Sequence, residues 1–306
     1  MTTMNSSRSF HFSHALLGAL LLLAMPTRAA TNLVAAMQPG SLAYHLATNT
    51  AAHAAQLLGT RAEMVEIHAP FTLEINRFFL PAWSHDFWLR GVQCLRATCI
   101  GYSNLNNGQG LVTMVSPRHY LCATHMHAEG HTIAFLDTHN HLHWRRTLER
   151  VDVGNDTSVG LLEDELPPSV GFLPVLPENF TNYLPTAYGC FVQGIGMNQD
   201  MCLFGQPTCF GDWNFVNWDS HAAVPSGLGT NWNVTIRGGD SSNPALLLIG
   251  DQLVLTTHNY HVNGGPSYAR QLPLINRAMH LLSTNHFLHS DFQLTEFPLT
   301  NWPAFK

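Results

Sequence analysis

Charged side chains are scarce in this chain of 306 residues, where they make up 11% of the sequence, and lysine and arginine form no cluster. Soluble domains usually contain roughly 25% charged residues, so uncharged polar side chains must supply the missing polarity here. The formal net charge is −6. An acidic chain without a basic cluster does not suit the phosphate backbone of nucleic acids, so we expect no nucleic-acid partner.

Long apolar runs are also few, and the clearest one, residues 15–25, is too short to span a bilayer comfortably. Arg8 precedes this run and small residues follow it at 26–30, which is the order of a secretory signal peptide. We expect residues 1–29 to be such a peptide, cleaved after Ala29, and the mature protein to be secreted or periplasmic without stable membrane insertion. An uncleaved membrane anchor is the alternative.

The chain has only six cysteines, and in an exported protein they favour disulfides. Four of them form two local pairs that can each close a small loop: Cys94 with Cys99, and Cys202 with Cys209. Cys122 and Cys190 remain. They either pair with each other or stay as buried free thiols, because both stand in apolar surroundings.

The sequence pattern changes near Trp88. Before it, residues 30–90 are rich in Ala, Leu, His and Thr and predict a helical or irregular N-terminal extension. After it, short apolar runs are broken by Gly, Asn, Asp and Pro, which is typical of the strands of an all-β sandwich or barrel. The clearest runs are 110–115, 132–136 and 245–249.

Two further segments have a recognisable local pattern. Residues 137–140 read Asp-Thr-His-Asn and predict a hairpin turn, since Asp and Asn tolerate turn geometry. Residues 272–283 carry apolar side chains at helical spacing, among them Leu274, Ile275 and Met279, and predict a closing helix.

Three segments bring together the residue types of acyl transfer, in the order His125, Asp156 and Ser241. A serine hydroxyl is a poor nucleophile until a base removes its proton, and a histidine can take that proton near neutral pH and return it to the leaving group. A buried carboxylate fixes the imidazole and stabilises its charged form. The sequence therefore predicts a serine hydrolase with these three residues as its catalytic groups.

The motifs around these residues resemble those of the chymotrypsin/trypsin family of serine peptidases. The Gly-Asp-Ser sequence at 239–241, with Pro244, is similar to the family's Gly-Asp-Ser-Gly-Gly-Pro. The Ala-Thr-His sequence at 123–125 resembles its Thr-Ala-Ala-His, and 156–159 resembles its Asp-Ile-Ala-Leu strand. Residues 173–177 look like the family's crossover between lobes, and the likeness extends over about residues 100–285.

The resemblance implies a fold and a set of roles. It implies a double six-stranded antiparallel β-barrel at 91–290 with a C-terminal helix, followed by a tail at 291–306. The backbone N–H groups of Gly239 and Ser241 would form the oxyanion hole, and Thr235 would lie in the specificity pocket. The substrate would be a protein or peptide, cleaved without a cofactor. Because Thr235 is neutral, we expect no strong preference for Lys or Arg at the cleaved position.

Departures from the family's motifs support a second hypothesis. Ser242 and Asn243 stand where the family has two glycines, and the sequence at 257–260 replaces its Ser-Trp-Gly strand. These differences favour a catalytically weak or inactive protease-like binding protein.

A histidine-rich stretch suggests a third hypothesis, a metal-dependent hydrolase. Its members are His125, His127, His131, His139, His141 and His143. Zinc needs three or four ligands that converge on one point. The sequence places His139 in a turn and His141 and His143 on one face of an exposed strand, so we expect solvent-facing or hairpin histidines and no metal.

Overall fold

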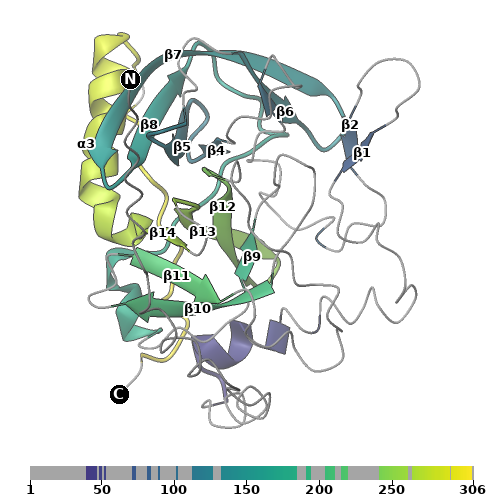
Figure 1. The fold of residues 1–306 in the computed structure, drawn as a ribbon, viewed down its shortest axis with the longest axis vertical. Helices are drawn as coiled ribbons and strands as arrows, with labels where there is room; N and C mark the ends of the chain where they lie inside the picture. Colours follow the sequence, from purple (N-terminus) through teal and green to yellow (C-terminus); the bar gives the residue numbers. More distant parts are fainter. Residues whose placement is uncertain are drawn as a thin grey trace, which may run out of the picture.

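Strands dominate the molecule, and one long helix lies near its C-terminus (Figure 1). The computed structural model describes residues 39–46, 48–49, 52, 71–73, 81–83, 89, 101–102, 112–126, 132–184, 191–193, 204–210, 215–219, 241–260, 264–289 and 291–304. The expected signal peptide and the cysteines at 94, 99, 190 and 202 lie outside these ranges, and so do Thr235 and Gly239. Within the described residues, no helix is long and apolar enough to cross a membrane.

The first of two six-stranded antiparallel sheets has the order β3-β6-β7-β8-β5-β4. Its strands are β3 (Gly101–Tyr102), β4 (Thr113–Met114), β5 (His119–Ala123), β6 (Thr132–Leu136), β7 (Leu142–Gly154) and β8 (Thr157–Leu162). The sheet curls, and β7, its longest strand, arcs across the top of Figure 1. A small hairpin of β1 (Phe71–Leu73) and β2 (Pro81–Trp83) lies beside β6.

The second six-stranded sheet has the order β13-β12-β9-β10-β11-β14. Its strands are β9 (Phe191–Gln193), β10 (Phe204–Phe210), β11 (Phe215–Asp219), β12 (Pro244–Ile249), β13 (Gln252–His258) and β14 (Gly264–Pro266). The short 3-10 helix η4 (Glu178–Asn182) precedes it, and helix α3 (Tyr268–Asn285) follows it. Helix α3 packs against β7 and β8 of the first sheet, along the left edge of Figure 1.

The two sheets repeat one pairing pattern. When the strands of each sheet are numbered in chain order, both sheets pair the first strand with the fourth, the fourth with the fifth, the third with the sixth and the second with the third. The first sheet adds a pairing between its fifth and sixth strands, and the second adds one between its first and second. The two halves of the chain therefore have the same strand order, interrupted at different places.

The hairpin of β12 and β13 is buried on both faces. Alternate side chains of β12 point to opposite sides, as the strand period of two requires: Leu246 and Leu248 join one apolar core, and Leu247 joins the other. Val254 of β13 likewise faces the second core, while Leu255 faces the first. This double burial explains the uninterrupted apolar run at 245–249, which the sequence predicted as a strand.

A close contact brings β5 and β8 together. Tyr120 of β5 pairs in register with Gly160 of β8, and the Tyr120 ring lies over Gly160. A Cβ atom at position 160 would overlap that ring, so only glycine leaves room for it. The Tyr120 hydroxyl reaches Thr147 Oγ1 at 3.1 Å and is thus partnered inside the core. The strand that leads to His125 is therefore held firmly against the strand that follows Asp156.

The segment expected to cross between the two halves does connect both sheets. The Leu173 N–H donates to the Met114 carbonyl of β4 at 2.9 Å, and the Leu255 N–H of β13 donates to the Pro174 carbonyl at 2.8 Å. Val175 also forms an isolated parallel bridge with Glu296. The C-terminal segment expected as a tail therefore packs on the body of the protein, and its Leu299 is buried.

The predicted hairpin turn and closing helix are both confirmed. The turn joins β6 to β7, and Asn140 has the positive φ of 63° that the turn requires. Burial of Asp137 opposes ionisation, but hydrogen bonds from His143, His141, His139 and Ser169 outweigh it and hold its pKa well below the usual range.

Helix α3 extends beyond 272–283 at both ends. Of the apolar residues at helical spacing, Ile275 and Met279 are buried and Leu274 is 51% exposed.

Two buried histidines should make the fold acid-sensitive. Burial lowers the pKa of His119 to about 4, with a further lowering by Arg118, and burial lowers that of His258 to about 3. In the unfolded chain these histidines have a pKa near 6.5. Between about pH 6.5 and pH 4 the unfolded chain therefore binds more protons than the folded chain. Stability should therefore fall with falling pH, by about 1.4 kcal/mol per pH unit for each histidine.

Urea unfolding at several pH values between about 6.5 and 4.5 measures this slope. His119→Gln should reduce the slope by about 1.4 kcal/mol per pH unit, whereas His289→Gln, at an exposed position, should leave it unchanged. Equal slopes for the wild type and His119→Gln would contradict the prediction.

Candidate active site

His125 and Asp156 meet at the ends of two paired strands. Ala123, the last residue of β5, pairs with Thr157, the first residue of β8, so the residues just beyond them are neighbours. His125 Nδ1 lies 2.6 Å from Asp156 Oδ2, and the His125 backbone N–H donates to Asp156 Oδ1 at 3.0 Å. The two carboxylate oxygens thus hold both the ring and the main chain of His125.

This geometry fixes the roles of the two imidazole nitrogens. A carboxylate only accepts hydrogen bonds, so Nδ1 of His125 must carry a proton, and the neutral ring then keeps its lone pair on Nε2. The His125 side chain is 44% exposed while that of Asp156 is 12% exposed. The base nitrogen can therefore meet a ligand from solvent, and the carboxylate that orients the ring is sheltered.

Asp156 lies in a turn with unusual backbone geometry. Gly154 has a φ of 89°, Asn155 of 53° and Asp156 of 57°. Asn and Asp adopt this left-handed region more readily than other non-glycine residues, but as single residues, so two in succession after Gly154 need surrounding contacts to hold them. Such strain commonly occurs at functional sites.

Gln271 of helix α3 is one of the contacts that hold this turn. Its side chain is buried, its Nε2 donates to the Gly154 carbonyl at 3.0 Å, and its Oε1 accepts from Thr157 Oγ1 at 2.9 Å. The Gln271 amide therefore hydrogen-bonds to Gly154 and Thr157, the residues on either side of Asn155 and Asp156. Gln271 was not predicted from the sequence, because its only local signal is a polar residue among the apolar ones of the buried helix face.

His258 of β13 is a second anchor. Its Nε2 lies 3.1 Å from the Asp156 carbonyl oxygen, and its Nδ1 lies 2.5 Å from the hydroxyl of Tyr268. A carbonyl only accepts, so Nε2 carries the proton, and the Tyr268 hydroxyl donates to Nδ1. The Asp156 carbonyl also accepts the Thr124 N–H at 2.9 Å. The low pKa of His258 keeps it neutral and preserves this arrangement.

His258 lies in the segment at 257–260, which departs from the Ser-Trp-Gly motif of the family that the sequence resembles. Its role in holding Asp156 was missed, because a buried histidine has no local sequence signal that distinguishes it from the other histidines of the chain.

The turn that contains Ser241 contacts the end of β5 through the next residue, Ser242. The Ala123 N–H donates to Ser242 Oγ at 2.6 Å, and Ser242 is buried with a positive φ of 71°. The Ser242 N–H in turn donates to the Asn259 carbonyl at 3.0 Å. These bonds hold Ser242 beside Ala123, which precedes His125 by two residues in the chain. Ser241 itself is half-buried.

The three predicted catalytic residues are thus brought together unequally. His125 and Asp156 are in direct contact, whereas across the described ranges no hydrogen bond links Ser241 with His125. Of the predicted oxyanion-hole residues, Ser241 is described and Gly239 lies outside those ranges. Thr235 lies outside them as well.

Cys122 can be set aside as an alternative nucleophile. It lies on β5 three residues before His125, and it is a buried free thiol, so it does not pair with Cys190. Burial raises its pKa to about 12, and the nearby Arg150 offsets this only in part. The thiolate is the reactive form of cysteine, so this side chain is inert near neutral pH.

Neither a protein-family model nor a curated protein matches this chain.

Proposed function

We propose that this protein is a secreted serine endopeptidase of the chymotrypsin kind, with Ser241 as nucleophile, His125 as base and Asp156 as the group that orients the base. The observation that carries the proposal is the pair of hydrogen bonds between Asp156 and His125, one to Nδ1 at 2.6 Å and one from the backbone N–H at 3.0 Å. The Ser242 contact with Ala123 supports Ser241 as the partner of this pair.

In the proposed mechanism, His125 Nε2 takes the Ser241 hydroxyl proton while Oγ attacks the peptide carbonyl carbon. The tetrahedral intermediate collapses when the imidazolium returns that proton to the leaving amine, and an acyl-serine ester remains. A water molecule, deprotonated by the same nitrogen, then releases the acid and restores the hydroxyl. The N–H groups of Gly239 and Ser241 would stabilise the oxyanion, and each such donor typically contributes about 100-fold to 1000-fold in rate.

The fold that fits this mechanism is a pair of six-stranded barrels. The repeated pairing pattern of the two sheets supports it, because closure between β3 and β4 and between β13 and β14 would complete two identical rings of strands. Gly265 of β14 already lies directly against the His258 carbonyl of β13. In this arrangement the first barrel would supply His125 and Asp156, and the second would supply Ser241.

The second candidate function is a protease-like binding protein without turnover. Ser242 and Asn243 in place of two glycines favour it, and so does the missing Ser241–His125 hydrogen bond. Catalytic hydrogen bonds are often long in enzymes without substrate, however, so that absence alone does not decide between the two.

Labelling with a fluorophosphonate separates these functions. The wild-type protein should be labelled at Ser241, Ser241→Ala should not be labelled, and Ser242→Ala should remain labelled, because only an activated serine reacts with this reagent. Mass spectrometry of the digest locates the label. A folded wild-type protein that stays unlabelled would establish the binding-protein alternative, and a label on another serine would refute the assignment of the nucleophile.

Gln271 should act as a positioning residue for Asp156. Gln271→Leu leaves the Gly154 carbonyl and the Thr157 hydroxyl without their partner, so the strained turn should shift. A misplacement of about 1 Å can cost on the order of 100-fold in rate, and we expect such a fall in kcat with little change in KM. Arg277→Ala, on the exposed side of the same helix, is the control. A variant with reduced stability but full kcat would assign Gln271 a structural role alone.

A further inference from the structure

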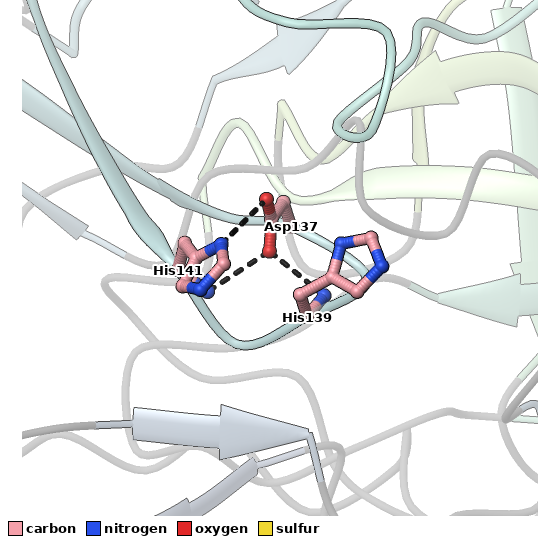
Figure 2. Close-up of side chains that lie close together, drawn as sticks. All are labelled: Asp137, His139 and His141. Atoms are coloured by element: carbon pink, nitrogen blue, oxygen red, sulfur yellow. Dashed lines mark hydrogen bonds and ion pairs between the residues drawn. The ribbon is translucent and has the colours of Figure 1, made fainter.

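A second group of side chains lies at the turn between β6 and β7, and Figure 2 shows the imidazoles of His139 and His141 on either side of the Asp137 carboxylate. One ligand atom from each of the three residues lies within 4.8 Å of the others. Asp137 is buried, whereas both histidines are exposed. We propose that this hairpin binds one divalent transition-metal ion of the zinc and copper class, with Asp137, His139 and His141 as its ligands.

The Asp137 carboxylate is already oriented for such a role. Its Oδ1 accepts the backbone N–H groups of His139 and His141, at 2.8 and 2.9 Å. Its Oδ2 lies 3.0 Å from His143 Nε2 and 3.1 Å from Ser169 Oγ. Metal-binding carboxylates are commonly held by outer hydrogen bonds of this kind. These four bonds use all the lone-pair sites of the carboxylate, so an ion at Oδ2 would displace the contact with Ser169 while the one with His143 remains.

The buried negative charge of Asp137 also favours the binding of a cation. The residue is 3% exposed, and a buried carboxylate is normally paired with a cation or bound to a metal. Within the described ranges its ion-pair partners are His141 and His143, which are cations only when protonated. A bound divalent ion would supply a permanent positive charge beside the carboxylate.

Side-chain rotation, chiefly of His139, would bring the three ligand atoms to the distances that zinc requires. Zinc lies about 2.0–2.2 Å from nitrogen and oxygen ligands in a tetrahedron, which places neighbouring ligand atoms roughly 3.3–3.6 Å apart. His141 Nδ1 and Asp137 Oδ2 are already 3.5 Å apart. His139 must turn away from its contact with Thr138 Oγ1, at 3.0 Å, and it is free to do so because its ring is exposed.

Ligand chemistry and rigidity narrow the choice of ion. Two imidazoles and one carboxylate suit zinc, copper or nickel, whereas calcium and magnesium prefer oxygen ligands throughout. The turn is braced from outside by Trp83, whose Nε1 donates to the Asp137 carbonyl at 2.9 Å and whose backbone N–H donates to Asn140 Oδ1 at 2.8 Å. A braced turn lowers the cost of ordering the ligands.

This site is separate from the proposed triad. Strand β7 begins just after His141 and ends at Gly154, two residues before Asp156, so the two groups lie at opposite ends of that strand. The inference therefore does not rest on the proposed function. Bound metal would fasten the hairpin and raise the stability of the whole chain by mass action.

Metal titration of the full chain tests the proposal. The protein is stripped with a chelator, desalted and titrated with Zn²⁺ against a chromophoric indicator, and with Co²⁺ while its visible spectrum is recorded. We expect one tight ion per wild-type chain. The double variant His139→Ala/His141→Ala should bind this ion at least about 100-fold more weakly, because two of the three ligands are lost.

The matched control is His280→Ala/His289→Ala, which removes two exposed histidines elsewhere and should bind like the wild type. His143→Gln tests the outer hydrogen bond and should weaken binding about 10-fold to 100-fold. Equal affinity of the wild type and the His139/His141 variant would overturn the proposal, and so would a wild type that binds no ion tightly. Neither result would bear on hydrolysis at Ser241.

Discussion

Ser241→Ala is expected to lower kcat/KM for peptide hydrolysis by about 10⁴-fold to 10⁶-fold, and this is the largest effect that the proposed mechanism predicts. The hydroxyl is the only group in the mechanism that bonds covalently to the substrate. Its loss leaves binding and oxyanion stabilisation, which together give a small residual rate. Steady-state kinetics on a peptide substrate, with the fold checked by circular dichroism, measures the effect.

Ser242→Ala is the matched control for this experiment. Ser242 is adjacent to Ser241, but its Oγ is occupied by the Ala123 N–H and its side chain is buried. Its loss removes one hydrogen bond, worth about 0.5–1.5 kcal/mol, and should cost far less activity than the loss of Ser241. The assignment of the nucleophile would be wrong if Ser242→Ala were inactive while Ser241→Ala kept its activity.

Asp156→Asn should reduce the rate by roughly 10⁴-fold with little change in structure. Both carboxylate oxygens accept hydrogen bonds from His125, one from the backbone N–H and one from Nδ1. An asparagine has one acceptor only. If its oxygen keeps the backbone N–H, its NH₂ group faces Nδ1, and the ring proton must then move to Nε2. The nitrogen that should accept the serine proton would no longer have a lone pair.

Asp152→Asn is the matched control for this change. Asp152 is exposed and accepts from the Gly154 N–H at 2.8 Å, close to the same turn but without contact to His125. It should retain most of the activity. Both variants are assayed with and without EDTA, because a metal-dependent hydrolase would lose activity to the chelator and tolerate Asp156→Asn. That pair of results would contradict the serine mechanism.

The structure also decides which aspartate belongs with His125. Asp137 and Asp152 also stand near His125 in the sequence, but only Asp156 is at the head of an apolar strand with the expected continuation. Asp137 lies at the opposite end of β7, inside the hairpin turn, and Asp152 faces Thr124 Oγ1 at 3.3 Å. Among the described residues only Asp156 contacts the His125 ring.

Local patterns determined much of the architecture. The apolar runs at 132–136 and 245–249 became β6 and β12, since apolar runs between turn residues favour strands. The Asp-Thr-His-Asn turn formed where it was predicted, because those side chains satisfy turn geometry by themselves. The helix was predicted from the spacing of its apolar residues, but that spacing does not decide that Ile275 is buried and Leu274 is exposed.

By itself the sequence thus determined the strands at 132–136 and 245–249, the turn, the helix and the residue types of the proposed triad, because each depends on neighbours within a few positions. Only the tertiary structure decided what holds Asp156, since Gln271 reaches Thr157 across 114 positions and His258 reaches Asp156 across 102. It also decided that Asp137 is buried while His139 and His141 beside it are exposed. Contacts at such separations, and the burial of Asp137, arise from packing, and no local pattern of residues encodes them.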